Sequence, residues 1–582
     1  MSFASKPRRL IAIAIALCIF APITLTMSSA NFTPQFTTLR IGLFSGQTAL
    51  PSANLQNAEG FGRGFDFGFF DNNRDFVPIG AWTNENRITV AIDRNMVWHP
   101  NAAEGRGEFR EGTQGSVVLG AFHVMLNPGF STFEEARVEA SRHPGAFVRY
   151  QADRQNQFFV MIGQHTTRAA AETALANLGI SGAEVCSGTS NTMKVVRTGT
   201  NHIIFEFDAG TTAFGVMPRP IGNENPETWF RGFRYHGGFA YSRRDGGFLT
   251  VINMVDIEDY VKGILPYEMS NTWPIEALKA QALTARTFAI RSIGRHASEG
   301  FDLCVEVHCQ VYRGRGLAND RTDRAVTETR GMFVTFEGRP AETVYASSNG
   351  GSSESSENVW MEARPYLRGI IDPWEADVAR RIPGYNWSVS HTPAQLTARI
   401  RDRFPASNLG TITAVRVTER SPSGNVIGVT LSDANGRTFT LSGRRQINLG
   451  LGTPTLRFDI VGGATWSPGG VFVNQPAQSV GQGGQISIIG GAGDVTTVPS
   501  AGVHAITGTG DVVIAGGGAT GGTGGGTGLV DGRFTFNGAG SGHQVGMSQW
   551  GAFSMAHYHN LTFRDIIHFY FTDVEITETY PR

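Results

Sequence analysis

The stretch GILPYEMSNTWPIEALKAQALTARTFAI, residues 263–290, decides the fold around a candidate site, because it sets a carboxylate just before a helix. Pro274 suits the first helical turn, where its missing N–H has no intrahelical partner, and Glu276 adds negative charge near the positive end of the helix dipole. Apolar residues then recur every three or four positions and predict one buried face, whose small central residues allow close approach of another element. These residues are Ile275, Leu278, Ala282, Ala285, Ala289 and Ile293.

Glu268 is the residue of this stretch that we expect to carry chemistry. Its neighbours Leu265, Tyr267 and Met269 are apolar or aromatic. Such surroundings remove water from a carboxylate and raise its pKa toward neutrality, which suits a general acid. The alternative is a solvated loop carboxylate, or one that pairs with an arginine.

The beginning of the chain has the pattern of an export signal. Lys6, Arg8 and Arg9 precede an apolar run of about fourteen residues, and small residues follow as a cleavage site. We therefore assign residues 1–30 to a signal peptide and expect an exported protein, extracellular, in the cell wall or on the outer face of the membrane. An uncleaved anchor is the alternative, although the run is shorter than the ~20 residues of a membrane span.

Length and charge limit the classes of protein that this chain can be. At ~100–200 residues per domain, 582 residues indicate three or four domains. The formal net charge of −1 provides no electrostatic attraction for nucleic acid, so we expect no nucleic-acid partner.

Hydrophobic patterning predicts a multidomain α+β fold. Residues 31–130 alternate short apolar runs with turn residues and predict a β-rich N-terminal module. Residues 131–196 predict a small βαβ module, with a strand at 158–163, a helix at 168–178 and a further strand at 193–196. The clearest runs of the first module are residues 38–43 and 88–92.

The second half of the chain mixes helices with strands. Residues 197–466, with a strand predicted at 248–255, form the first part of a larger domain, and residues 530–582 return to the same globular composition. Between them, residues 467–529 are rich in Gly, Val, Thr and Ala. Ordering such a tract costs too much backbone entropy for a core, so we interpret it as a Gly-rich insertion or linker.

Several motifs of the second half resemble the stage II sporulation protein D (SpoIID/LytB) family. The resemblance covers roughly residues 197–466 and 530–582. Its motifs are DYVKGILPYEM (259–269), WPIEALKAQA (273–282), ARTFA (285–289), CQVYRG (309–314), YASSNGG (345–351), LR (367–368) and GHQVGMSQWGA (542–552). Where the family commonly has glycine after the histidine His543, this chain has Gln544, which leaves a tight turn there in doubt. His543 itself is expected either to hydrogen-bond near the cleft or to satisfy local backbone.

Residues 131–196 resemble the small sporulation-related repeat (SPOR) domain. The strand VMIGQ, residues 160–164, and the Ala-rich helix at 169–178 carry this resemblance. An unrelated βαβ packing element is the alternative.

The SpoIID resemblance implies an exported cell-wall protein, because the sporulation member is a lytic transglycosylase acting on peptide-stripped glycan strands. Glu268 matches the catalytic glutamate of that family. It would protonate the leaving oxygen of a MurNAc–GlcNAc β-1,4 bond and then, as a carboxylate, assist the C6 hydroxyl to attack C1, forming a 1,6-anhydro sugar. A hydrolase would instead use a second carboxylate. Glu258 and Glu276 are candidates for it, although we expect them at a strand end and on the helix dipole.

The same family also implies a different class of function. Amidase enhancers share the fold and stimulate a cell-wall amidase without cutting glycan. A non-catalytic, glycan-binding wall protein is the remaining alternative.

Polar residues of the matched motifs are the predicted substrate contacts, since glycine allows backbone to approach a sugar and tyrosine stacks on it. They are Arg286, Tyr345, Ser348, Asn349 and Gly350. The alternatives are a buried bond that anchors the helix for Arg286, and a place in a strand core for Tyr345.

Four residues have the composition of a zinc site. His296, Cys304, His308 and Cys309 offer two imidazoles and two thiolates, which suit tetrahedral zinc, and some family members bind zinc here. We expect such an ion to order the loop and not to take part in catalysis. A reduced cysteine pair or a Cys304–Cys309 disulfide, favoured by an oxidising compartment, is the alternative.

Overall fold

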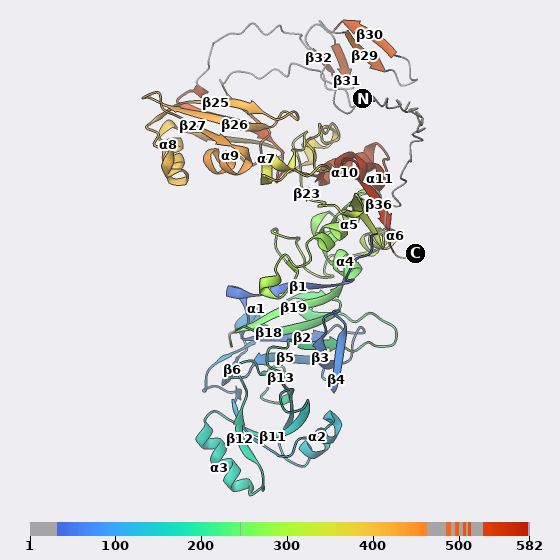
Figure 1. Ribbon diagram of the computed structural model, residues 1–582, viewed down its shortest axis with the longest axis vertical. Helices are drawn as coiled ribbons and strands as arrows, with labels where there is room; N and C mark the ends of the chain where they lie inside the picture. Colours follow the sequence, from blue (N-terminus) through green and yellow to red (C-terminus); the bar gives the residue numbers. More distant parts are fainter. Residues whose placement is uncertain are drawn as a thin grey trace, which may run out of the picture.

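The computed structural model describes residues 32–244, 246–461, 485–489, 495–499, 504–507, 510–513 and 528–579. The predicted signal peptide, residues 1–30, lies outside these ranges, and so does most of the predicted insertion, residues 467–529. The chain has the predicted α+β fold, with β-sheets at one end, a helical middle and a second β-rich part that projects from it as an arm (Figure 1).

A seven-stranded sheet joins the beginning of the described chain to the strand that leads into the site. In it β1 (Thr38–Phe44) pairs antiparallel with β19 (Leu249–Asp256), with Leu39 opposite Val255. Both strands were predicted from the sequence and are confirmed. The sheet order is β20 (Leu303–Cys304), β1, β19, β18 (Gly238–Arg243), β15 (Phe214–Pro218), β3 (Phe65–Phe70) and β4 (Phe76–Thr83).

A ten-stranded sheet mixes the three predicted regions 31–130, 131–196 and 197–466. Its order is β12 (Glu184–Ser187), β9 (Phe122–Met125), β11 (Gln157–His165), β10 (Phe147–Gln151), β14 (Ile203–Asp208), β13 (Met193–Arg197), β5 (Arg87–Ile92), β2 (Ser52–Asn57), β16 (Thr228–Phe230) and β17 (Phe233–Tyr235). The predicted boundaries at 130/131 and 196/197 therefore do not separate sheets. Local patterning misplaced them because strand pairing between distant segments leaves no local signal.

Within the SPOR-like region, the predicted strand and helix are present as β11 and α3 (Arg168–Leu178). Thr167 caps the helix at its first turn, and Gly179 ends it in the left-handed conformation with φ 60°. Glu184–Ser187 forms β12, which pairs with β9 before the chain reaches β13. The region is thus part of the ten-stranded sheet and not a separate module, and its likeness to a SPOR domain stays a prediction.

The helical middle is built around α5 (Ile275–Arg291). This helix packs against α4 (Ile257–Glu268), α6 (Asp320–Glu328), α10 (Gln549–Tyr558) and α11 (Phe563–Tyr570). It is buried on nearly all sides between residues 277 and 290, so its core contact is wider than the predicted single face. Residues after the insertion complete this part through two strand pairs, β21 (Met332–Phe336) with β36 (Glu575–Glu578) and β23 (Tyr345–Ala346) with β35 (Met547–Ser548).

The arm comprises residues 386–461 and 528–539 and has a hydrophobic core of its own, including Leu396, Ile412, Val429 and Phe536. It projects to one side in Figure 1. Its elements are β24 (Asn386–His391), α8 (Pro393–Arg403), β25 (Ile412–Arg420), β26 (Val426–Asp433), β27 (Thr438–Ser442), α9 (Gly443–Leu451), β28 (Phe458–Ile460), β33 (Leu529–Val530) and β34 (Arg533–Ala539).

The remaining elements are short. They are β6 (Met96–His99), α1 (Ala102–Gly105), β7 (Glu108–Glu111), β8 (Val118–Leu119), α2 (Phe133–Ala140), β22 (Arg339–Pro340) and α7 (Ser356–Trp360). Four strands lie within residues 467–529 and pair two by two: β29 (Gln485–Ile489) with β30 (Val495–Pro499), and β31 (His504–Thr507) with β32 (Gly510–Val513). Among the described residues, no helix has the length and hydropathy to cross a membrane.

Candidate active site

Glu268 is the last residue of α4, a helix that the sequence analysis did not predict. The Asp256 side chain accepts a hydrogen bond from Glu258 N at 2.8 Å and caps its start. Gly263 and Pro266 lie inside the helix and disguise its pattern, since both residue types disfavour helix interiors. Gly263 is required there because an added Cβ would lie 2.4 Å from the Tyr312 ring.

The Glu268 carboxylate is held by neutral donors. The backbone N–H of Val311 donates to Oε1 at 3.1 Å, and Nε2 of Gln549 lies 3.5 Å from Oε2. The Tyr345 hydroxyl also hydrogen-bonds to it. Burial raises the pKa of Glu268 above its ordinary value, while these three bonds stabilise the charged form and oppose that rise. The carboxyl is therefore partly desolvated, and it is hydrogen-bonded without an arginine among these partners.

A chain of hydrogen bonds continues from Glu268 into the core. Nε2 of Gln310 donates to the Tyr345 hydroxyl at 3.0 Å, and the Tyr260 hydroxyl donates to Oε1 of Gln310 at 3.3 Å. Tyr345 is half-buried on β23, which agrees with its predicted place in a strand, and its hydroxyl contacts Glu268. Its contact with substrate stays a prediction. These bonds fix the orientation of the hydroxyl that faces Glu268.

Ser348, Asn349 and Gly350 surround a different carboxylate, Glu375. Oγ of Ser348 donates to it at 2.8 Å, and the backbone N–H groups of Asn349 and Gly350 donate at 2.7 and 2.9 Å. Ser348 and Asn349 are 0% and 2% exposed. The prediction that they contact substrate is therefore not supported, because their polar atoms face inward.

Asp372 lies beside Glu375, and the two make a buried acidic pair. Nδ2 of Asn349 donates to Asp372 at 2.8 Å, and the Tyr570 hydroxyl donates at 2.6 Å. Burial and the charge of Asp372 raise the pKa of Glu375 to about 6, and burial also raises the pKa of Asp372. Ser548, the residue before Gln549, also donates to Glu375. The acidic pair is thus connected to Glu268 through the adjacent residues Ser548 and Gln549.

Arg286 is not a substrate contact. Its side chain is fully buried, and Nη2 lies 2.6 Å from Oε2 of Glu258. Further bonds reach Thr329 and the carbonyl of Val326. The alternative stated for it, a buried bond that anchors the helix, describes what the structure shows.

Glu258 and Glu276, the two candidates for a second catalytic carboxylate, have structural partners. Glu258 binds Arg286 and accepts from the backbone N–H of Gly331 at 3.2 Å. Glu276 pairs with Lys279 at 2.8 Å and accepts from the N–H of Phe563 at 2.9 Å, which ties α5 to α11.

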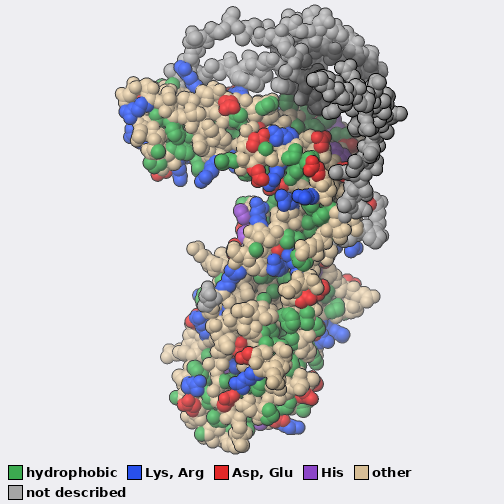
Figure 2. Space-filling view, in the orientation of Figure 1, with side chains coloured by type: hydrophobic (Ala, Val, Ile, Leu, Met, Phe, Trp, Pro, Cys, Tyr) green, Lys and Arg blue, Asp and Glu red, His purple; other side chains and the backbone are tan. Residues whose placement is uncertain are grey.

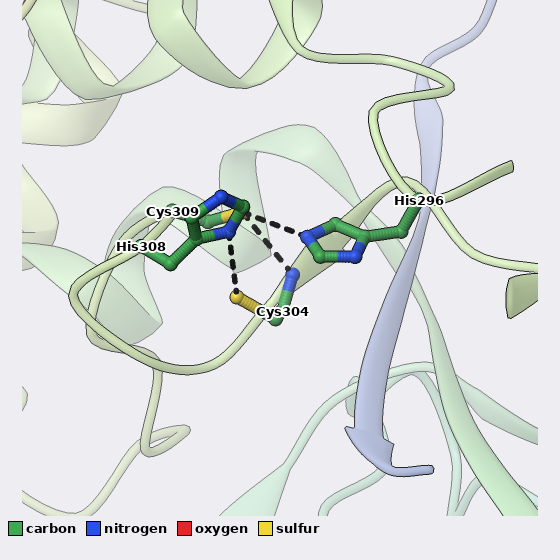
Figure 3. Close-up of side chains that lie close together, drawn as sticks. All are labelled: His296, Cys304, His308 and Cys309. Atoms are coloured by element: carbon green, nitrogen blue, oxygen red, sulfur yellow. Dashed lines mark hydrogen bonds between the residues drawn. The ribbon is translucent and has the colours of Figure 1, made fainter. Parts of the chain in front are cut away.

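His296, Cys304, His308 and Cys309, hereafter the Cys/His cluster, point toward one another (Figure 3). Their ligand atoms all lie within 4.8 Å of one another, and both cysteines are free thiols. Nitrogen–sulfur separations are 3.5 Å for His296–Cys309 and 3.7 Å for His308 to either cysteine. Tetrahedral zinc with Zn–S of ~2.3 Å and Zn–N of ~2.0–2.1 Å places sulfur and nitrogen about 3.6 Å apart. The donor set therefore fits zinc in type and in spacing.

Two further features suit a cation at the cluster. Nδ1 of His296 lies 2.8 Å from Glu299, which leaves Nε2 directed at the cluster, the usual outer-shell arrangement of a metal-binding histidine. A hydrogen bond with Cys309 lowers the pKa of Cys304 to about 4, and the same interaction raises the pKa of Cys309. One thiolate is thus favoured even in the absence of a metal ion.

His543 and Gln544 form a turn that the sequence analysis placed in doubt. Gln544 has φ 65°, so the left-handed turn forms without glycine. Its side chain accepts from Leu456 N at 2.7 Å and donates to Asn349 O at 2.8 Å, which fixes the turn between the arm and the site. His543 satisfies local backbone by accepting from Val545 N at 3.1 Å. Burial lowers the pKa of His543 to about 4, so it is neutral at pH 7.

Sequence reasoning missed roles for Gln549, Val311, Gln310, Asp372 and Glu375. The first three stand in motifs that were recognised, so their position in those motifs was a usable signal. Asp372 and Glu375 lie outside every quoted motif. Figure 2 shows the surroundings of the helical middle: the surface is concave between the arm and the rest of the molecule, and histidine side chains lie on its wall.

The part of the chain that contains Glu268 is similar to known proteins. The family model described as stage II sporulation protein (SpoIID) matches residues 245–336. An uncharacterized protein of Brachyspira hyodysenteriae is 28% identical over 358 residues, covering 60% of this chain and 73% of that protein. The amidase enhancer of Bacillus subtilis is 26% identical over 270 residues, covering 43% and 36%.

Stage II sporulation protein D of Bacillus subtilis is 30% identical over 179 residues, covering 28% of this chain and 51% of that protein. The matches thus span about half or less of the two Bacillus subtilis proteins. The segment matched by the family model contains Glu268, Arg286 and the Cys/His cluster. Residues 245–336, which carry Glu268 and the Cys/His cluster, are therefore similar to the SpoIID family.

Proposed function

We propose that this protein is a peptidoglycan lytic transglycosylase that cleaves MurNAc–GlcNAc β-1,4 bonds in peptide-stripped glycan strands. The observation that carries the proposal is the Glu268 carboxyl, partly desolvated and held by Val311, Tyr345 and Gln549. Relatives named for sporulation and for amidase enhancement support a role in cell-wall remodelling during sporulation.

Glu268 acts in two protonation states. Its raised pKa enlarges the protonated fraction of the carboxyl at a given pH, and this proton passes to the glycosidic oxygen as the C1–O bond breaks. The carboxylate that remains accepts the proton of the C6 hydroxyl while that oxygen bonds to C1. The products are a 1,6-anhydro end and a free hydroxyl end, and Glu268 ends protonated as it began. Val311 and Gln549 stabilise the carboxylate between the two transfers, because they donate to its two oxygens.

A single carboxylate is enough for this reaction because no water has to be activated. Four other acids near the site are already engaged: Glu258 with Arg286, Glu276 with Lys279, Glu375 with the loop 348–350, and Asp372 with Asn349 and Tyr570. This pattern favours the anhydro-forming reaction over hydrolysis.

We also propose that the Cys/His cluster holds a structural zinc ion. When bound, zinc would supply a cross-link between residue 296 and the loop 304–309. Gln310 and Val311 follow directly and contact Tyr345 and Glu268. Ordering this loop therefore positions Val311 directly and Tyr345 through Gln310, two of the three partners of the acid, which is why we assign the cluster a loop-ordering role.

For the whole protein we propose an exported location, in the cell wall or on the outer face of the membrane, where glycan strands are available. Residues 131–196 would assist targeting if their SPOR likeness reflects glycan binding. The amidase-enhancer relative favours one other function, stimulation of a cell-wall amidase as a binding partner.

The deciding experiment compares wild-type protein with Glu268→Gln on purified peptide-free glycan. Mass spectrometry should find anhydro-ended fragments with wild type and none with the variant. Binding to the same glycan is measured in parallel. If neither protein makes fragments although both bind glycan and both stimulate an amidase, the enhancer function replaces the transglycosylase.

A further inference from the structure

The arm contains a cavity of about 700 Å³ that lies apart from Glu268. It opens beside β24, β28 and β34, and its wall reaches Gly350 in the loop around Glu375. The residues that give it chemical character are Asn386, Trp387, Arg420, Arg457, Asp459 and Asn537. We propose that this cavity is a second saccharide site that binds a carboxylate-bearing sugar unit.

The charge of the cavity favours an anion. Arg420 and Arg457 both line it, against one carboxylate, Asp459, whose side chain is 82% exposed. Arg420 is itself 7% exposed and is held in place by Asp459, Phe458 O and Gly424 O. Burial lowers the pKa of Arg420, and the nearby charge of Arg457 lowers it further while Asp459 opposes both effects. One positive charge is therefore uncompensated within the lining, and guanidinium groups match the planar geometry of a carboxylate.

The rest of the lining suits a sugar ring. Trp387 supplies an aromatic side chain, and it packs so closely over Gly538 that an added Cβ there would lie 2.2 Å from its ring. The ring is half-buried and packs against Phe458 in the core of the arm, on the face of β24 opposite to Asn386. Asn386 and Asn537 are exposed on the paired strands β24 and β34 and offer amide donors and acceptors for hydroxyl and acetamide groups. Exposed amides beside an arginine pair suit the hydroxyl, acetamide and carboxylate groups of an acidic amino sugar better than those of a neutral sugar.

The position of the cavity fits a polymer that also reaches Glu268. Gly350 follows Tyr345 by five residues, so the two lie at most about 18 Å apart along an extended chain. The identity of the polymer rests on the proposed function: in peptide-stripped glycan the carboxylate is the lactyl group of each muramic acid. The site itself does not depend on cleavage.

The test measures binding by full-length Glu268→Gln protein, which keeps cleavage out of the assay. Peptide-free glycan fragments are titrated calorimetrically beside fragments of the same length whose lactyl carboxyls have been reduced to alcohols. We expect the acidic fragments to bind at least tenfold more tightly than the reduced ones. The double variant Glu268→Gln/Arg457→Gln should lose most of that preference. Arg457→Lys should retain part of it, because the charge stays while the fork geometry is lost.

Arg416→Gln is the matched control, since Arg416 is an exposed arginine of the same arm on β25 outside the cavity lining. It should leave the preference unchanged. Equal affinity for acidic and reduced fragments, or an unchanged preference in Arg457→Gln, would overturn the proposal. Neither outcome would affect the anhydro-product assay with Glu268 intact, so failure of this site and failure of the proposed activity are distinguishable.

Discussion

Oε2 of Glu268 lies 3.5 Å from Nε2 of Gln549, although 281 positions separate the two residues in the chain. Ser548, next to Gln549, donates to Glu375. The start of α10 therefore touches both the acid of the proposed reaction and the buried acidic pair beside it.

Replacing Gln549 with Leu should shift the pH dependence of cleavage. Glu268 must be protonated to act as an acid, so activity falls as pH rises through its pKa. Gln549 stabilises the carboxylate and lowers that pKa, so its loss should move the alkaline limb upward by up to about one pH unit. Rates of anhydro-product release between pH 4 and 9 measure the shift.

The control for that profile is Gln446→Leu. Gln446 is a glutamine of the arm whose Oε1 accepts a hydrogen bond from Ser442 N at 3.0 Å, so it offers the same substitution away from the site. Its profile should match wild type. If the alkaline limb of the Gln549→Leu profile stays at the wild-type pH or moves to lower pH, Gln549 does not lower the pKa of Glu268.

Breaking the Arg286–Glu258 pair should destabilise the fold. Arg286→Met leaves Glu258 as a buried, unpaired charge, and such changes cost about 3–5 kcal/mol. Denaturant unfolding should show this loss, and adding Glu258→Gln should recover part of it. Arg324→Met is the matched control, because Arg324 forms an exposed pair with Glu328 and its loss should leave stability nearly unchanged. A mild effect of Arg286→Met would contradict its anchoring role.

Glu375 should make stability depend on pH in a defined window. Its pKa rises on folding from 4.5 to about 6, so its contribution is fully present below pH 4.5 and is lost as pH rises through 6. Relative to Glu375→Gln, wild-type protein should lose on the order of 2 kcal/mol between pH 4.5 and 6.5. Thermal unfolding of both proteins across this range measures it, and parallel curves would mean that the Glu375 pKa is not raised.

Zinc should bind the Cys/His cluster with one ion per chain. Elemental analysis should find that ion in wild type and should not find it in Cys304→Ser. The control is Cys186→Ala, which changes a free cysteine outside the cluster and should retain the ion. Glu299→Gln removes the carboxylate behind His296 and should weaken zinc binding by about 10–100-fold. Chelation should also speed hydrogen exchange at the Val311 amide. Unchanged exchange after zinc removal would contradict the loop-ordering role.

The comparison of α4 with α5 shows how far local patterns reach. For α5, a proline start and apolar spacing predicted the helix, and the structure places its bounds at Ile275–Arg291. For α4 the same reasoning failed, since Gly263 and Pro266 interrupt a helix that surrounding contacts stabilise. Arg286 shows a second limit: its chemistry suited a sugar, but burial against Glu258 assigns it to the core.

The sequence by itself determined the α+β class, the strands β1 and β19, helix α5, and Glu268 and the Cys/His cluster as candidates, because these depend on spacing between near neighbours. Only the tertiary structure decided that the three N-terminal regions share sheets, that Ser348 and Asn349 face Glu375, and that Gln549 reaches Glu268. Those relations join residues up to hundreds of positions apart, and they arise from burial and hydrogen-bond satisfaction in three dimensions, which no local pattern encodes.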